Sequence, residues 1–140
     1  MEKCSEGIFQ SRPKLLVVDD ESSIRRHLHT LAESLGFEVA TASDGVEGWQ
    51  SFLVERPDLV ILDIYMPRMN GLALLSKIKA DAPECPVVLI TGFLNYEQLI
   101  KTGGDKPDGC IVKPLNLKKT GDLLVRLARQ SMGEAAGELA

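Results

Sequence analysis

Charged side chains in this sequence fall directly after short apolar runs. Asp19 and Asp20 follow one such run, Asp63 follows a second, and Lys113 follows a third. Three carboxylates held within several ångströms of one another repel strongly unless a cation lies between them. Carboxylate oxygens suit Mg2+, and also Mn2+, which leave coordination positions open for a phosphoryl oxygen. The acidic residues therefore predict a divalent metal site, provided that the fold brings them together.

A carboxylate beside such a metal can attack phosphorus and form an acyl phosphate. The charge that develops on the equatorial oxygens would be offset by the metal and by a fixed ammonium, for which Lys113 is the candidate. Thr91 ends another apolar run, and its hydroxyl could donate a hydrogen bond to the phosphoryl oxygens once they arrive. Any one of these residues alone is more simply explained as a helix cap or a loop residue than as part of a chemical site. Complementary groups after four apolar runs favour a joint site.

Five short apolar runs predict the strands that would position these groups. Residues 15–18, 59–62 and 87–90 are continuous and rich in β-branched side chains, which is typical of strands buried on both faces. Residues 37–41 are mixed and predict an edge strand, and residues 110–112 predict a short last strand. Because parallel strands end at one edge of their sheet, the charged groups would meet there.

Helical periodicity appears between the predicted strands. The N-caps that we expect are Ser22 or Ser23, Asp44 and Asn116. The inward-facing stripes that we expect are Ile24, Leu28, Leu31 and Leu35; Val46, Trp49 and Leu53; Leu72, Leu75 and Ile78 in a helix over residues 71–81; and Leu117, Thr120, Leu124 and Leu127. A fourth helix, near residues 96–101, is expected to be short, because residues 103–109 are rich in helix breakers. Strict alternation of strand and helix predicts a doubly wound parallel α/β fold.

Composition excludes several classes of protein. The 140 residues are 44% hydrophobic and 26% charged, which is typical of one soluble globular domain. With 16 basic against 20 acidic residues, the chain has no positive surplus, so we expect no nucleic-acid binding by it alone. Cys4, Cys85 and Cys110 are far apart and predict neither a disulfide framework nor a zinc site. Without a long apolar run or a signal peptide, we expect a cytoplasmic protein with no membrane partner.

The sequence resembles the receiver domain of two-component response regulators over about residues 13–130. The resemblance rests on four motifs in order, at residues 15–21 (LLVVDDE), 63–71 (DIYMPRMNG), 89–92 (LITG) and 112–114 (VKP). It implies a five-stranded, flavodoxin-like (βα)5 fold. We expect residues 1–12 to be a disordered N-terminal tail and residues 131–140 a C-terminal tail.

The resemblance also implies roles for the acidic residues. Asp63 would accept a phosphoryl group from a phosphohistidine of a sensor histidine kinase or a histidine phosphotransfer protein. Asp20, Asp63 and the backbone carbonyl of Tyr65 would ligate Mg2+, and Asp19 would help through bound water. The protein would then be a phosphoacceptor signalling domain and not an enzyme that turns over a separate substrate.

The same resemblance implies a switch beside the lysine. Lys113 would pair with the phosphoryl group, Thr91 would move toward it, and Gly92 would leave the acyl phosphate accessible. The expected switch and partner face comprises Thr91, Gly92, Phe93 and Cys110. Family members usually carry an aromatic residue where this chain has Cys110. Output to an unidentified partner protein through a different surface or a reordering loop is therefore an open alternative.

Three other functions compete with this interpretation. A receiver-like scaffold that is never phosphorylated would not need the whole set of chemical groups that the motifs retain. A magnesium-dependent phosphohydrolase with an aspartyl-phosphate intermediate would need a second acid two residues after its nucleophile, where this chain has Tyr65. A dinucleotide oxidoreductase is disfavoured because the first strand leads into acidic residues and not into a glycine-rich phosphate loop.

Overall fold

The computed structural model describes residues 11–92 and 105–133 of the 140-residue chain. The elements are β1 (Lys14–Val18), α1 (Ser22–Ser34), β2 (Glu38–Ala42), α2 (Gly45–Glu55), β3 (Leu59–Asp63), α3 (Gly71–Asp81), β4 (Val87–Thr91), β5 (Gly109–Val112) and α5 (Leu117–Ser131). All five predicted strands are confirmed to within one residue at each end. The helix predicted near residues 96–101 lies outside the described residues.

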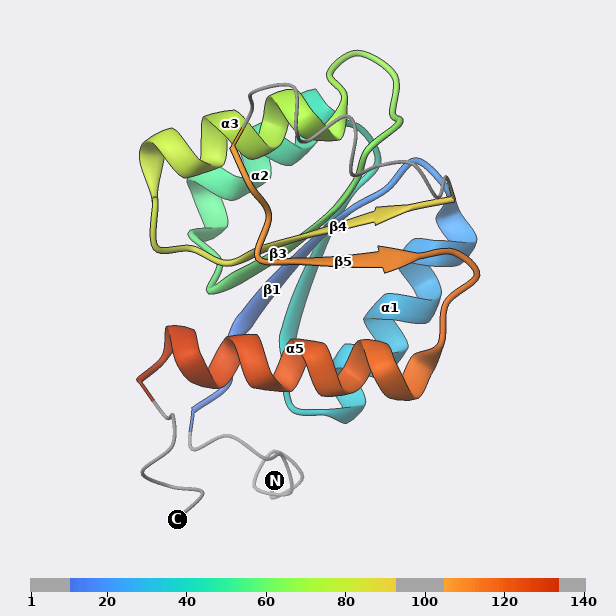
Figure 1. The fold of residues 1–140 in the computed structure, drawn as a ribbon, viewed down its shortest axis with the longest axis vertical. Coiled ribbons are helices and arrows are strands. Elements are labelled where there is room, and N and C mark those ends of the chain that lie inside the picture. The colour runs from blue at the N-terminus through green and yellow to red at the C-terminus, as the bar shows by residue number, and fades with distance from the viewer. Residues whose placement is uncertain (1–10, 93–104, 134–140) are drawn as a thin grey trace.

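The strands form one parallel sheet in the order β2-β1-β3-β4-β5. Helices α2 and α3 cover one face of the sheet, and α1 and α5 cover the other (Figure 1). This is the doubly wound architecture that the alternation of strand and helix predicts. β2 lies at an edge, as expected from its mixed sequence, and only its last residue, Ala42, is buried.

Two hydrophobic clusters, one on each face of the sheet, form the core. Leu15 and Val17 of β1 point into the cluster with α1 and α5, whereas Leu16 and Val18 point into the cluster with α2 and α3. All four side chains are fully buried. The continuous apolar run of β1 is thus explained by burial on both faces, because alternate residues of a strand point to opposite sides.

Helix α2 packs on a different face from the predicted one. Its buried residues are Gly45, Gly48 and Phe52, whereas Trp49 is only partly buried and Leu53 is 44% exposed. A Cβ added at Gly45 would lie 2.1 Å from a backbone oxygen of the β3–α3 loop, and one at Gly48 would lie 2.9 Å from a β1 side chain. The predicted stripe was wrong for Leu53, whereas Trp49 packs against the core cluster; the closest approach of the helix to its neighbours is through glycines. Apolar side chains flank that contact.

The helix ends confirm two of the three predicted caps. Asp44 and Asn116 each accept a hydrogen bond from the backbone amide three residues later, at 2.8 and 2.9 Å. The prediction of a serine cap for α1 was wrong, because the N-cap residue is Glu21 and its side chain makes no capping hydrogen bond. Leu117, expected to face inward, is 50% exposed in the first turn of α5. None of the helices in the described ranges is both long and apolar enough to cross a membrane.

Candidate functional site

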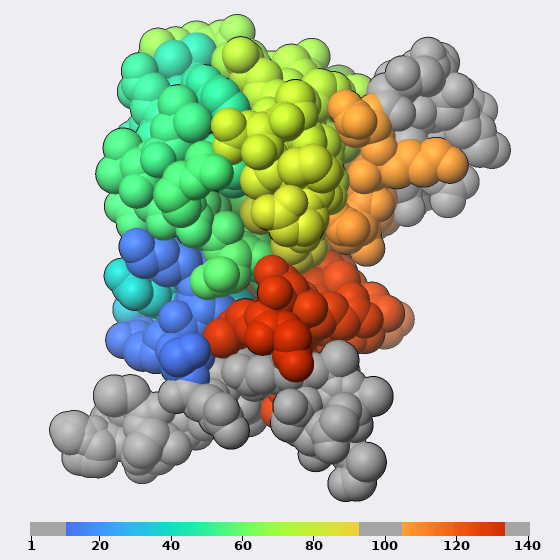
Figure 2. All heavy atoms as spheres, turned by 90° about the vertical axis from the view of Figure 1, so that its left-hand side faces the viewer, coloured from blue at the N-terminus to red at the C-terminus, as the bar shows by residue number. Residues whose placement is uncertain are grey.

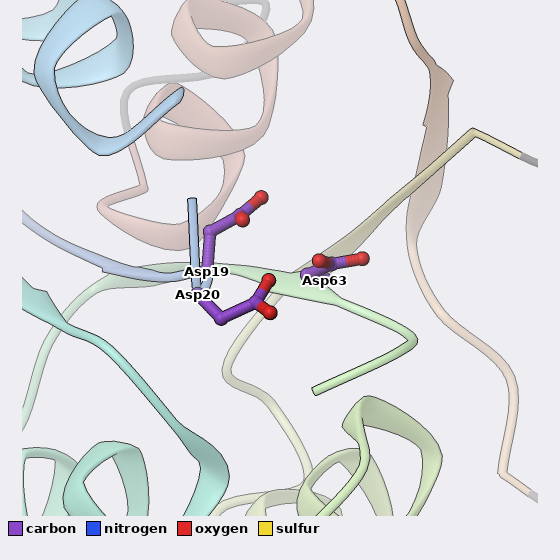
Figure 3. Close-up of side chains that lie close together, drawn as sticks. All are labelled: Asp19, Asp20 and Asp63. Atoms are coloured by element: carbon purple, nitrogen blue, oxygen red, sulfur yellow. The ribbon is translucent and has the colours of Figure 1, made fainter. Parts of the chain in front are cut away.

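Three aspartates meet at the carboxyl edge of the sheet. Asp19 and Asp20 follow β1, and Asp63 is the last residue of the neighbouring strand β3 (Figure 3). One carboxylate oxygen from each lies within 4.8 Å of the others. Asp19 is fully buried and Asp63 is 5% exposed, whereas Asp20 is exposed to solvent. The edge of the parallel sheet therefore brings together the acids that follow two separate apolar runs.

Local hydrogen bonds fix the orientation of the first buried carboxylate. Oδ1 of Asp19 accepts from the backbone amide of Glu21 at 2.8 Å, and the guanidinium of Arg25 donates to the Asp19 carbonyl at 2.7 Å. The Asp19 amide donates to the carbonyl of Ala42 on β2 at 3.1 Å. Main-chain contacts with both β2 and α1 thus hold this residue, so that its second oxygen, Oδ2, faces the cluster.

The loop after β3 holds the second buried carboxylate. Oδ1 of Asp63 accepts a hydrogen bond from the Tyr65 amide at 3.3 Å. The Gly71 amide at the start of α3 donates a hydrogen bond to the carbonyl of Ile64 at 2.8 Å. A Cβ at Gly71 would lie 2.1 Å from the carbonyl oxygen of Asp63. Only glycine allows this close return of the chain. The role of the Tyr65 carbonyl as a metal ligand stays a prediction; its side chain is 47% exposed.

Lys113 is the cation of the site. It follows β5, and its Nζ lies 3.4 Å from Asp19 Oδ2 and 3.6 Å from Asp63 Oδ2. Its shortest contact, 2.5 Å, is a hydrogen bond to Glu21 Oε1. Three carboxylates of the described residues therefore contact this lysine, and Asp20 lies near two of them in the three-aspartate cluster.

The expected switch residues are only partly within the described chain. Thr91 ends β4 and is fully buried, and its carbonyl accepts a hydrogen bond from the Lys113 amide at 2.7 Å. Gly92 is exposed, and a Cβ there would meet nothing within 4 Å. Cys110 is partly buried and packs against the cluster beneath α2 and α3. Phe93 lies outside the described residues. The switching role of these residues remains a prediction.

Burial raises the pKa values of the two buried acids. Desolvation is the largest influence on Asp63, followed by the charge of Asp19, and together they raise the pKa of Asp63 to about 7. Burial likewise raises the pKa of Asp19. For Lys113, burial alone would lower the pKa, but the hydrogen bond to Glu21 and the attraction of both buried carboxylates outweigh it, and the pKa rises. The positive charge of Lys113 is thus not enough to offset the unfavourable effect of burial on the ionised forms of Asp19 and Asp63.

This donor set fits a divalent cation. Asp19 Oδ2 is buried and accepts no hydrogen bond from any described residue, although Lys113 lies nearby. Such an atom is unfavourable in a folded protein unless an ion or water satisfies it. The three carboxylates supply the hard oxygen ligands that Mg2+ and Mn2+ prefer, and the exposure of Asp20 leaves a route of entry.

Comparison with known proteins identifies the family. A family model for the response regulator receiver domain matches residues 15–124. The chain belongs to the receiver-domain family of response regulators. This result confirms the resemblance carried by the four sequence motifs. A receiver domain of this family is a phosphorylation-based signalling module.

Curated relatives of this receiver domain are longer proteins. A probable transcriptional regulator ycf27 of Guillardia theta is 36% identical over 117 residues, which is 84% of this chain and 46% of that protein. The regulatory protein AtoC of Escherichia coli strain K12 is 32% identical over 117 residues, 84% of this chain and 25% of that protein. The chain therefore spans about half or less of the length of these relatives.

Solved structures confirm the flavodoxin-like receiver fold. A response regulator receiver domain protein from Clostridium thermocellum has a TM-score of 0.76 at 30% identity, covering 86% of this chain and 97% of that chain. A CheY-like receiver domain protein from Methanospirillum hungatei JF-1 has a TM-score of 0.79 at 27% identity, covering 89% of this chain and 100% of that chain.

Glu21 is a site residue to which the sequence motifs assign no role of its own. This residue belongs to the motif at residues 15–21, but an exposed glutamate beside two aspartates has no distinctive signal of its own. Its partner, Lys113, is 92 positions away along the chain. Arg25 likewise has no distinctive sequence signal, because its contact with the Asp19 carbonyl depends on the turn between β1 and α1.

Proposed function

We propose that this receiver domain accepts a phosphoryl group on Asp63 with the help of Mg2+ and thereby changes a surface that a partner protein recognises. The observation that carries the proposal is the arrangement at the carboxyl edge of the sheet. A nearly buried carboxylate, Asp63, lies beside two other aspartates and within 3.6 Å of a lysine ammonium. Nucleophile, anionic ligands and charge-stabilising cation are thus adjacent.

Asp20 and Asp63, together with Asp19, would hold the metal ion. Asp19 has the orphaned buried oxygen and Asp20 has the exposed carboxylate. When bound, Mg2+ would supply positive charge next to the phosphoryl oxygens. Mn2+ has the same preference for oxygen ligands and is expected to substitute. The carbonyl of Tyr65 is a further proposed ligand from the loop after β3.

The transfer itself uses side chains of this chain. A carboxylate oxygen of Asp63 attacks phosphorus, an acyl phosphate bond forms, and the bond from phosphorus to the donor breaks with its electron pair leaving on the donor. Lys113 then lies close enough to contact the incoming phosphoryl oxygens. Thr91, buried at the end of the adjacent strand, would donate its hydroxyl hydrogen to one of them. The acceptance of that hydrogen bond is the proposed start of the switch.

The proposed donor is a phosphohistidine on a sensor histidine kinase or a histidine phosphotransfer protein. Membership of the receiver family supports a partner of this class, and the names of the curated relatives indicate transcriptional regulation. Because this chain spans only part of those proteins, the output partner or output domain is part of the proposal. The competing interpretation is a receiver-like scaffold whose Asp63 is never modified.

Intact-mass measurement after incubation with Mg2+ and acetyl phosphate, a small acyl phosphate, tests the proposal. We expect the protein to gain one phosphoryl group, and to gain none when Mg2+ is chelated or in an Asp63→Asn variant. Asp122→Asn, an exposed aspartate on α5, is the matched control and should behave as the unmodified protein does. Absence of any gain in folded protein that binds Mg2+ would instead support the scaffold.

A further inference from the structure

Glu21 competes for the lysine that the phosphoryl group needs. Lys113 Nζ is 2.5 Å from Glu21 Oε1, whereas its distances to Asp19 and Asp63 are 3.4 and 3.6 Å. Of the three contacts, the one with Glu21 has hydrogen-bond geometry. In the unphosphorylated domain the ammonium is therefore directed chiefly toward a carboxylate that lies outside the three-aspartate cluster.

The position of Glu21 in the chain gives a second, independent observation. Glu21 is the N-cap residue of α1, a position at which serine, threonine, aspartate and asparagine side chains usually accept a hydrogen bond from the first turn. The Glu21 side chain makes no such bond, and two serines follow it without providing the cap. Local rules of helix stability are typically broken where a side chain serves another contact. Here that contact is with Lys113.

We propose that Glu21 is a positioning residue that retains Lys113 in the unphosphorylated state and releases it when a phosphoryl group arrives on Asp63. The inference rests on the proposed function, because it concerns the lysine that would contact the phosphoryl oxygens. It assigns to the turn between β1 and α1 the control of how readily the domain is phosphorylated.

Burial and charge explain why the contact can be exchanged. The Glu21 side chain is 55% exposed, so water can solvate its carboxylate after release, whereas Lys113 is only 19% exposed and needs an anionic partner. A phosphoryl group brings nearly two negative charges, compared with the single charge of a carboxylate. The ammonium is therefore expected to move to the phosphoryl oxygens and leave Glu21. Before transfer, the same hydrogen bond must be weakened, which slows the reaction.

Two substitutions at the same position test the proposal. Glu21→Gln removes the charge but keeps the length of the side chain, and Glu21→Asp keeps the charge but is one methylene shorter and is a favourable helix cap. With acetyl phosphate at limiting concentration and Mg2+ at saturation, we expect both variants to be phosphorylated about threefold faster than the unmodified protein. Glu38→Gln, which removes an exposed glutamate at the start of β2, is the matched control and should leave the rate unchanged.

The Lys113 ε-ammonium provides a spectroscopic readout that a purely structural role of Glu21 would not change. A hydrogen bond slows the exchange of ammonium protons with water, so the Lys113 15N–1H signal should be visible in the unmodified protein and broadened in both Glu21 variants. Unfolding measurements should show that Glu21→Asp is at least as stable as the unmodified protein. A faster rate in that variant therefore cannot be attributed to loss of structure.

Each other outcome has a distinct meaning. If both Glu21 variants are phosphorylated at the rate of the unmodified protein, or more slowly, the retention of Lys113 is refuted while the proposed function stands. If only Glu21→Gln is faster, simple repulsion between Glu21 and the anionic donor explains the rate, and the inference is again refuted. If the unmodified protein is not phosphorylated at all, the proposed function fails and this inference fails with it.

Discussion

Charged side chains are paired differently at the two ends of the sheet. At the amino end, which faces the viewer in Figure 2, two cations each have an acidic partner of their own. Nζ of Lys79 lies 2.8 Å from Asp108, and Arg56 lies 2.8 Å from Asp81. At the carboxyl end, the three carboxylates of Asp19, Glu21 and Asp63 share Lys113, and the carboxylate of Asp20 lies near those of Asp19 and Asp63. One end of the domain satisfies its charges, and the other concentrates charge of one sign.

This difference separates the stability of the domain from its chemistry. Asp108 also accepts the amide of Val87 at 2.8 Å, so the amino end joins the loop before β5 to α3 and to the first residue of β4. At the carboxyl end, Asp19 Oδ2 accepts no hydrogen bond from residues 11–92 or 105–133, and burial beside Asp19 raises the pKa of Asp63 to about 7. Unsatisfied charge is unfavourable for folding, but it makes this end receptive to a cation and to a phosphoryl group.

The largest effect on stability is expected at Gly71, where the main chain of α3 approaches the backbone of Asp63 most closely. In Gly71→Ala, the new Cβ would lie 2.1 Å from the Asp63 carbonyl, and the β3–α3 loop would have to move. We expect a loss of about 3 kcal/mol of unfolding free energy and a weakened response to Mg2+. Urea unfolding with and without Mg2+ measures both quantities.

Gly92→Ala is the matched control for that substitution. A Cβ at Gly92 would meet nothing within 4 Å, although the residue lies at the same end of the sheet. We expect a change in stability below about 0.5 kcal/mol. Equal losses in Gly71→Ala and Gly92→Ala would contradict the conclusion that the close approach to Asp63 matters.

The next effect concerns pH. Burial raises the pKa of Asp63 to about 7 in the folded protein, from 3.8 in the unfolded chain. The unfolded chain therefore releases this proton first, and metal-free protein should lose stability as the pH rises from about 4 to about 7, with no further loss from this group above that range. Asp63→Asn cannot ionise and should be more stable than the unmodified protein by about 2 kcal/mol at about pH 8.

Urea unfolding in the presence of a chelator, at about pH 4 and about pH 8, checks this sign. At the lower pH, where Asp63 is protonated in the folded protein, the advantage of the Asp63→Asn variant should largely disappear. Adding Mg2+ at the higher pH should stabilise the unmodified protein and leave the variant almost unchanged. A variant that is less stable than the unmodified, metal-free protein at the higher pH would contradict the view that this end of the sheet is short of positive charge.

The smallest effect is expected at the amino end. Asp108→Ala removes the side-chain acceptor of the Val87 amide and the carboxylate partner of Lys79, which keeps its bond to the Cys85 carbonyl, so we expect a loss of about 1.5 kcal/mol. The initial rate of phosphorylation should not change. Asp81→Ala, which removes only the exposed pair with Arg56, is the control and should be nearly neutral. A change in phosphorylation rate in Asp108→Ala would break the separation between the two ends.

The strands could be predicted from the sequence because their signal is local. A run such as residues 59–62 has few alternatives to a strand buried on both faces, and each such run is found within one residue of its predicted bounds. The face of α2 could not be predicted in this way. Two of its three buried residues, Gly45 and Gly48, are glycines, and glycine has no hydrophobic signal. Leu117 was misplaced because the first turn of α5 extends beyond the core.

The meeting of the site residues could also be predicted, for a geometric reason. Asp19, Asp63 and Lys113 follow parallel strands, and such strands end at one edge of the sheet. The hydrogen bond between Lys113 and Glu21 could not be predicted, because it depends on the direction of the Glu21 side chain at the start of α1. Side-chain direction is set by neighbours that are distant in sequence, and local patterns carry no information on them.

Backbone hydrogen bonds continue across the three strands that carry Asp63, Thr91 and Lys113. The Ile64 amide donates to the carbonyl of Ile90 at 3.2 Å, and the Lys113 amide donates to the carbonyl of Thr91 at 2.7 Å. These hydrogen bonds between neighbouring strands therefore keep the backbone spacing of the three residues constant. Information about the chemical state of Asp63 must then leave the site through rotation about side-chain bonds and through the loops beyond the ladder. A partner protein would therefore detect side chains and loops in a new orientation, while the backbone of the sheet stays unchanged.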